Sequence, residues 1–239
     1  MAKLKVMCAR SMHEMVTALA YDFTNETGHA VELSFGTVGA LQKRLDAGET
    51  ADVVVSSILA LEGLEKAGLL ATGSRKNIAT VHIGIAVRDG APTLDISTPA
   101  AFKQALIDAR RIAFSDAAVG GSAGVYLARL FVELGLGDMI REKGMPQQSG
   151  GEVAQRVANG EADIGMTLIA EIVPVRGARV LGSLPAPLGN ATTYCAGVMA
   201  SSGAADAALA FIAALRNPSA ADMWQEAGFE VATPSPRSP

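Results

Sequence analysis

Two stretches of the sequence are similar: Gly39-Ala-Leu-Gln-Lys-Arg-Leu-Asp-Ala-Gly-Glu-Thr-Ala-Asp-Val53 and, later in the chain, Gly151-Glu-Val-Ala-Gln-Arg-Val-Ala-Asn-Gly-Glu-Ala-Asp-Ile164. Each copy predicts a short amphipathic helix with a late arginine, followed by Gly-Glu, Ala-Asp and an apolar strand. The copies begin about 110 residues apart, a spacing far above the periods of solenoid repeats. We therefore interpret them as one copy in each of two similar lobes. Coincidence is the alternative, since matches of Ala, Gly and Val are common.

Strand and helix patterns alternate along the rest of the chain. Alternating or continuous apolar runs predict strands at residues 4–8, 30–35, 52–56, 78–87, 111–115, 163–168, 179–184 and 194–200. Helical spacing predicts helices at residues 12–27, 40–47, 60–67, 98–109, 125–134, 151–158, 204–215 and 220–227. This alternation predicts an α/β fold in which each lobe is a mainly parallel sheet flanked by helices.

Composition excludes several classes of protein. The chain has 239 residues, a formal net charge of -4, 49% apolar residues and 18% charged residues, which rules out a disordered chain. The acidic balance and the absence of a basic run argue against nucleic-acid binding. The sequence contains no run of about 18 apolar residues, so it predicts no membrane-spanning helix.

Cysteine and histidine usage predicts neither a disulfide framework nor a metal site. Cys8 and Cys195 lie in apolar, strand-like runs, so we expect buried thiols that act as small hydrophobes. His13, His29 and His82 are far apart and lack the spacing of metal ligands. We therefore expect no metal and no cofactor.

The two ends of the sequence lead to separate expectations. The sequence Met1-Ala-Lys-Leu-Lys-Val6 enters the first strand with no apolar signal region. This predicts a periplasmic protein if a signal peptide was removed, and a cytoplasmic one if Met1 is the native start. The tail, residues 233–239, is expected to be disordered.

Four strand-to-helix junctions are rich in small residues. They lie at residues 10–12, 36–39, 120–124 and 149–152, and Ser11, Thr37, Ser122 and Ser149 add hydroxyl groups. A helix N-terminus exposes unpaired N–H groups and the positive end of the helix dipole. In open α/β sheets such junctions form the ligand site, so we expect an anion in a cleft between the lobes. Ordinary capping by Ser and Thr is the alternative, and it is compatible with binding.

Arg10 is the most informative of these residues. It follows an apolar strand in a loop of otherwise small groups, where a guanidinium would hold a carboxylate through two parallel hydrogen bonds. The alternative is an arginine that reaches into solvent. If the protein is an enzyme, His13 and Glu171 are the candidate general bases, although an exposed histidine and a solvated glutamate are the simpler interpretations.

Five motifs in order resemble the periplasmic molybdate-binding protein family, the type II solute-binding proteins of ABC transporters. They are Cys-Ala-Arg-Ser-Met at residues 8–12, Phe-Gly-Thr-Val-Gly-Ala-Leu at 35–41, Gly-Glu-Thr-Ala-Asp-Val-Val-Val-Ser-Ser at 48–57, Ser-Ala-Gly-Val-Tyr at 122–126, and Gly-Phe at 228–229 with an upstream Trp224. The resemblance covers nearly the whole chain.

The resemblance implies two lobes joined by two crossover segments. The first lobe would hold residues 1–80 and 186–239, and the second would hold residues 81–185. Hinges are expected at residues 75–81 and 184–189, with closure of the lobes around the ligand.

The resemblance also gives a set of ligand-binding residues. The predicted set is Arg10, Ser11, Thr37, Val38, Gly39, Gly121, Ser122, Ala123, Ser149, Gly150 and Leu168. Ser11 matches a family serine. Val38 stands where a second serine belongs and Leu168 where a tyrosine belongs, so two hydroxyl donors are lost, and Thr37 is a candidate substitute. Arg10 replaces a small residue and adds a positive charge, which favours an organic carboxylate over molybdate.

Several functions remain open at this point. The first is a solute-binding protein that captures a small organic anion and passes it to an ABC transporter permease. The second is an isomerase of a small tricarboxylate, because aconitate isomerase resembles this family. A molybdate or tungstate binder and a cytoplasmic sensor are further alternatives. We expect a monomer that binds no nucleic acid and does not insert into a membrane.

Overall fold

The computed structural model describes residues 1–231, and its contacts divide the chain into two units. Unit 1 holds Met1–Gly36, Leu41–Thr80 and the chain from Thr193 onward, and unit 2 holds Thr37–Ala40 and Val81–Thr192. The predicted tail at residues 233–239 lies outside the described part of the chain.

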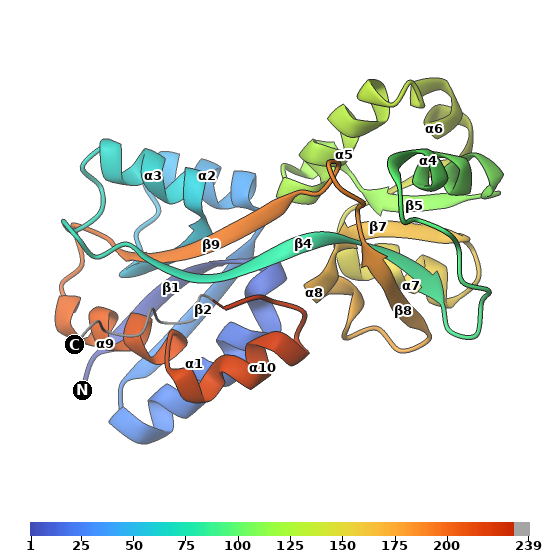
Figure 1. Cartoon of the computed structure of the whole chain (residues 1–239). Helices are drawn as coiled ribbons and strands as arrows, with labels where there is room; N and C mark the ends of the chain where they lie inside the picture. The colour runs from blue at the N-terminus through green and yellow to red at the C-terminus, as the bar shows by residue number, and fades with distance from the viewer. Residues whose placement is uncertain (232–239) are drawn as a thin grey trace, which may run out of the picture. The chain divides into compact units, whose positions relative to one another are not determined.

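Unit 1 is an α/β layer structure around one sheet (Figure 1). Its strands run in the order β2-β1-β3-β9, with β1, β2 and β3 parallel and β9 antiparallel to β3. Its elements are β1 (Lys3–Ala9), α1 (His13–Thr27), β2 (Ala30–Gly36), most of α2 (Val38–Asp46), β3 (Val53–Ser57), α3 (Ile58–Lys66), the first part of β4 (Lys76–Arg88), most of β9 (Ala191–Val198), α9 (Ala205–Leu215) and α10 (Ala221–Glu226). Helices α1, α9 and α10 lie along one face of this sheet, and α2 and α3 along the other (Figure 1).

Apolar burial on both faces holds unit 1 together. The side chains of Val53, Val54 and Val55 in β3 are fully buried, as expected of a parallel strand covered on both sides. On one face, Phe23 of α1 meets Phe211 of α9 edge to face, with ring centroids 5.3 Å apart. Each such side chain contributes about 1.5–3 kcal/mol through its burial.

Unit 2 repeats the same plan. Its strands run in the order β4-β7-β5-β6, with β5, β6 and β7 parallel and with β4 antiparallel to both β7 and β8. Its elements are the rest of β4, α4 (Pro99–Asp108), β5 (Ile112–Ser115), α5 (Ser122–Glu133), α6 (Gly137–Lys143), β6 (Gly144–Gln147), α7 (Gly150–Ala158), β7 (Ile164–Leu168), α8 (Ile169–Ile172) and β8 (Ala178–Ser183). The fold predicted from the sequence, two similar α/β lobes, is confirmed.

Matched hydrogen bonds show that the sequence repeat is a structural repeat. The side chain of Asp52 accepts from the backbone N–H of Lys5 at 2.8 Å, and that of Asp163 accepts from the N–H of Arg110 at 2.7 Å. In each copy the aspartate therefore fixes the start of the neighbouring parallel strand.

The late arginine of each copy also has the same role. Arg44 Nε donates to Glu49 Oε2 at 2.7 Å, and Arg156 pairs with Glu161. These contacts lower the pKa of Glu49, chiefly through the hydrogen bond from Arg44. Hydrogen bonds from Asn159 and Arg156 likewise lower the pKa of Glu161.

The structure adds two helices, α6 and the four-residue α8, and one strand, β6, that the sequence pattern did not indicate. Helix α6 and strand β6 follow α5, and β6 contains Pro146. Strand β6 pairs with β5 alone, at the end of the sheet order. A proline is tolerated in β6 because an edge strand needs fewer N–H donors. Strands were located in the sequence by their apolar pattern, and a strand that contains proline does not show that pattern.

The segment Thr37–Ala40, expected in the first lobe, is grouped with unit 2. Elsewhere the chain crosses between the units inside strands, and the second of these crossings differs from the expected one. The division by contacts falls at Thr80/Val81 in β4 and at Thr192/Thr193 in β9, whereas the expected second boundary was 185/186. Residues 186–192 belong with unit 2 because Tyr126 donates to the carbonyl of Leu188 and Ile83 N–H donates to that of Asn190.

Candidate ligand-binding site

In unit 1, the predicted residues occupy a single tight turn at the carboxyl end of β1. Arg10–Met12 form a 3-10 turn that runs directly into α1, with Met12 buried and Arg10 exposed. The Ser11 hydroxyl donates to the phenol oxygen of the buried Tyr194 in β9, at 2.6 Å. Ser11 is therefore held in place by a partner 183 residues away in the chain.

Arg10 and His13 differ in how firmly they are held. Arg10 makes no ion pair or side-chain hydrogen bond within residues 1–231, so its guanidinium is available to an anion. The His13 ring packs against Phe35 with centroids 4.4 Å apart, and its Nδ1 lies 3.1 Å from Glu14 Oε1. The His13 side chain is half exposed, which fits the surface histidine that the sequence favoured.

In unit 2, the segment Thr37–Ala40 is fixed by the loop that precedes α5. Thr37 Oγ1 donates to the carbonyl of Val119 at 2.6 Å and accepts from the N–H of Ala40 at 3.2 Å. The N–H of Gly39 donates to the carbonyl of Gly120 at 3.2 Å. The single proton of the Thr37 hydroxyl and the N–H of Gly39 are thus already used by the protein.

The first turn of α5 is more open. Ser122 accepts from the Thr192 hydroxyl at 3.1 Å, which leaves its own proton for another acceptor. A Cβ added to Gly121 would meet nothing within 4 Å. Helix N-termini carry unpaired N–H groups, so this turn can contribute donors to an anion.

The first turn of α7 is capped as the sequence indicated. Ser149 Oγ accepts from the N–H of Glu152 at 3.3 Å, and Glu152 Oε2 accepts from the N–H of Gln148 at 3.1 Å. This pair differs from a standard capping box in that Glu152 accepts from the residue before the cap instead of from Ser149 itself. Ser149, like Ser122, keeps its own hydroxyl proton.

Glu171 lies directly against the first residue of α7. A Cβ added to Gly150 would overlap Glu171 Oε2 and Thr167 Oγ1, so any other residue there would force these two side chains to move. Thr167 is fully buried in β7, and its hydroxyl donates to Glu171 Oε2 at 2.8 Å. Ser115, at the carboxyl end of β5, donates in turn to Thr167 Oγ1 at 2.8 Å. Side chains from β5, β7 and α8 are thus linked by hydrogen bonds from Ser115 through Thr167 to the Glu171 carboxylate.

The remaining predicted residues contribute backbone or apolar surface. Ala123 and Leu168 are buried, and Val38 opens α2. Ser115, Thr167 and Tyr194 were not predicted. The only signal for Thr167 in the sequence was a hydroxyl inside an otherwise apolar strand, which does not name its partner.

Two further predictions concern cysteines and metals. Cys8 and Cys195 are free and buried, as predicted, and burial raises the pKa of both thiols. Among residues 1–231, no three His, Cys, Asp or Glu side chains gather in a way that could hold a metal ion. No helix in the same described range is long and apolar enough to cross a membrane.

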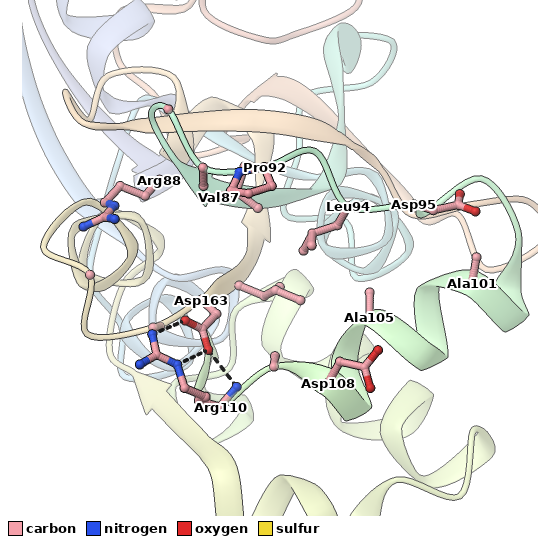
Figure 2. Close-up of a pocket in the computed structure, with 16 residues that line it drawn as sticks. Val87, Arg88, Pro92, Leu94, Asp95, Ala101, Ala105, Asp108, Arg110 and Asp163 are labelled. Carbon is pink, nitrogen blue, oxygen red and sulfur yellow. Dashed lines mark hydrogen bonds and ion pairs between the residues drawn. The ribbon is translucent and has the colours of Figure 1, made fainter.

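Unit 2 also has a hollow of about 720 Å³ at the opposite ends of its strands (Figure 2). It lies where β4 finishes and where β5 and β7 begin, and Leu94 and Ala105 line it. Asp163 and Arg110 point toward one another beside it (Figure 2). None of the predicted ligand residues belongs to its lining, and ligands of α/β sheets bind at the carboxyl ends of the strands.

Two α/β units of the same topology, with small-residue turns and helix N-termini at the carboxyl ends of their parallel strands, define the solute-binding class of proteins. The chain belongs to the family of bacterial extracellular solute-binding proteins, whose sequence profile matches residues 4–230. The resemblance to the periplasmic molybdate-binding proteins of ABC transporters is confirmed.

Three relatives place the chain within this family. Aconitate isomerase from Pseudomonas sp. is 34% identical over 206 residues, which are 85% of this chain and 75% of the relative. The molybdate-binding protein ModA of Escherichia coli (strain K12) is 22% identical over 231 residues, which are 96% of this chain and 89% of the relative. The solved periplasmic molybdate-binding protein of Azotobacter vinelandii has a TM-score of 0.78 and 24% identity, covering 96% of this chain and all of that one.

Proposed function

We propose that the protein binds a small organic carboxylate and that Arg10 is its principal cationic contact. The observation that carries this proposal is the exposed Arg10 guanidinium at the carboxyl end of β1, without an ion pair in residues 1–231. A guanidinium suits a carboxylate because two parallel N–H···O bonds form at once.

The donors that a molybdate site would need are reduced in this chain. Leu168 is buried and apolar at the place where the family resemblance implies a tyrosine, and Val38 supplies no hydroxyl. Thr37, the candidate substitute, directs its proton to the carbonyl of Val119. These observations support an organic anion over a tetrahedral oxyanion.

The proposed role in the cell follows from the family. We propose that the protein captures its ligand outside the cytoplasm and passes it to the permease of an ABC transporter. Co-purification of the protein with such a permease, dependent on the ligand, is the expected result. A native chain found only in the cytoplasm would contradict this role.

A panel of thermal shifts tests the ligand. Citrate, cis-aconitate, trans-aconitate and malate are compared with molybdate, tungstate, sulfate and phosphate. A ligand at about a hundred times its dissociation constant stabilises the folded protein by roughly 2.7 kcal/mol, which is readily measured. We expect stabilisation by a carboxylate and none by the four inorganic oxyanions.

The Arg10→Ala variant tests the contact. We expect its affinity for the carboxylate to fall by about tenfold to a hundredfold, the loss typical of a charge-assisted hydrogen bond. Arg176→Ala is the matched control, because Arg176 is also exposed and makes no ion pair in the described residues. Equal losses in the two variants, or none in either, would contradict the proposed role of Arg10.

Isomerisation of a tricarboxylate is the second candidate. It is favoured by the 34% identity to an aconitate isomerase, against 22% to a molybdate-binding protein. Such a reaction needs a base that removes a proton beside a carboxylate and returns it at another carbon. Glu171, hydrogen-bonded to Thr167, and His13 are the proposed bases. The test is turnover of trans-aconitate. Turnover in the wild-type protein that is lost in Glu171→Ala or His13→Ala supports this function. Absence of turnover in the wild-type protein rejects it.

A further inference from the structure

The position of Glu171 bears on which anions unit 2 accepts. The Glu171 carboxylate lies against Gly150, the first residue of α7, so closely that any side chain at Gly150 would overlap it. Helix α7 has nine residues, and a carboxylate beside its first turn is stabilised by the positive end of the helix. The first turn of α7 therefore already has a carboxylate of the protein's own beside it.

The surrounding contacts fix this carboxylate in position. Thr167 is 0% exposed and donates to Glu171 Oε2 at 2.8 Å, and Ser115, 8% exposed, donates to Thr167 at 2.8 Å. Both hydroxyls come from the ends of β-strands, whose backbones are held by the sheet. A rotation of the Glu171 carboxylate away from α7 would leave the buried Thr167 hydroxyl without this acceptor.

We propose that Glu171 is a specificity-determining residue, which occupies the anion position at the first turn of α7 and thereby excludes free tetrahedral oxyanions such as molybdate and tungstate. A second anion brought next to this carboxylate would meet like-charge repulsion. An organic carboxylate escapes this exclusion when its charged groups do not bind at the first turn of α7. This inference rests on the proposed function and deepens it.

The test measures oxyanion binding in a charge-removed variant. Glu171→Gln keeps the size of the side chain and removes its charge. We expect molybdate and tungstate to bind this variant about tenfold or more tightly than they bind the wild-type protein, measured by equilibrium dialysis with elemental analysis. Glu171→Ala is measured in parallel, so that failure of one variant to fold leaves the other.

Glu152→Gln is the matched control. Glu152 also lies in the first turn of α7 and the substitution changes the net charge equally, but its carboxylate bonds the N–H of Gln148 instead. A gain in oxyanion affinity in the Glu171 variants alone supports the proposal. An equal gain in Glu152→Gln overturns it, because net charge would then explain the effect. No gain in any variant, or wild-type binding as tight as that of the variants, overturns it as well.

The same measurements separate this inference from the proposed function. Carboxylate binding is scored on the wild-type protein alone. If the wild type binds no carboxylate but the Glu171 variants gain oxyanion affinity, the proposed function fails and the inference stands. If the wild type binds a carboxylate and the variants still reject oxyanions, the inference fails and the proposed function stands.

Discussion

Gly124, in the first turn of α5, has no room for a side chain. A Cβ there would lie 2.5 Å from the carbonyl oxygen of Asp116 and 2.7 Å from its carbonyl carbon. The obstacle is backbone, which cannot move aside as the end of a side chain would. Gly63, in the middle of α3, is the opposite case, because a Cβ there would meet nothing within 4 Å.

The two glycines predict substitutions of opposite sign. We expect Gly124→Ala to lower the free energy of unfolding by about 2–3 kcal/mol, since the first turn of α5 must shift away from the Asp116 backbone. We expect Gly63→Ala to raise it by about 0.5–1 kcal/mol, because alanine restricts the unfolded chain and favours the helix. Urea unfolding of both variants gives the two values. Destabilisation of similar size in both would contradict the steric explanation.

Residue-scale features were the least predictable from the sequence. The sequence indicated Arg10, Ser122 and the Ser149 cap, because a helix start is a local pattern. It did not indicate that Ser11 meets Tyr194 or that Ser115 meets Thr167, since those hydroxyl pairs are 183 and 52 residues apart. Such pairs depend on the strand order, which one sequence does not fix.

At the scale of elements, the two copies of the repeated helix and strand make equivalent hydrogen bonds. In both copies an aspartate accepts a backbone N–H at the start of the neighbouring strand, from Lys5 in one unit and from Arg110 in the other. Asp163 is held further by the side chain of Arg110. The hydrogen bond from Arg110 is the main reason that the pKa of Asp163 lies below its usual range. The repeat was visible in the sequence because this hydrogen-bond pattern needs the same residue types at the same spacing.

This contact makes stability depend on pH with a definite sign. A lowered pKa means that ionised Asp163 stabilises the folded state, and that this contribution is lost as pH falls through the folded pKa. We expect Asp163→Ala to cost about 2 kcal/mol at pH 7, because the backbone N–H groups of Arg110 and Arg111 and the guanidinium of Arg110 lose their charged acceptor. The cost stays constant down to about pH 5 and shrinks below about pH 4, where the carboxyl group of the unfolded chain begins to take up its proton while that of folded Asp163 stays ionised to lower pH.

Urea unfolding of the wild type and the variant at several pH values measures this change. Asp22→Ala is the control, since Asp22 is exposed on α1 and its loss is expected to change stability by less than about 0.5 kcal/mol. A cost of Asp163→Ala that is the same at pH 3.5 and pH 7 would show that the charge of Asp163 is not responsible.

At the scale of the whole molecule, strands β4 and β9 each belong to both units. Strand β4 runs without a break from Lys76 to Arg88 through the division at Thr80/Val81, and β9 crosses at Thr192/Thr193. The first crossing falls at the sequence-derived boundary, residue 80, whereas the second lies seven residues beyond 185. The later position depends on hydrogen bonds of residues 188–192 with Ile83, Ser122 and Tyr126, which no local pattern records.

The shared strands predict that the units unfold together, and Trp224 provides the probe. It is the single tryptophan of the chain, lies buried in unit 1 and donates from Nε1 to the carbonyl of Leu215. Val153, fully buried in the core of unit 2, is the site of the perturbation.

We expect Val153→Ala to remove about 2 kcal/mol of stability by deleting two buried methyl groups. The urea midpoint of Trp224 fluorescence should then shift as far as that of far-UV circular dichroism, because loss of unit 2 disrupts β4 and β9 inside unit 1. A fluorescence midpoint that stays at its wild-type value while the circular dichroism shifts would show that unit 1 folds independently of unit 2.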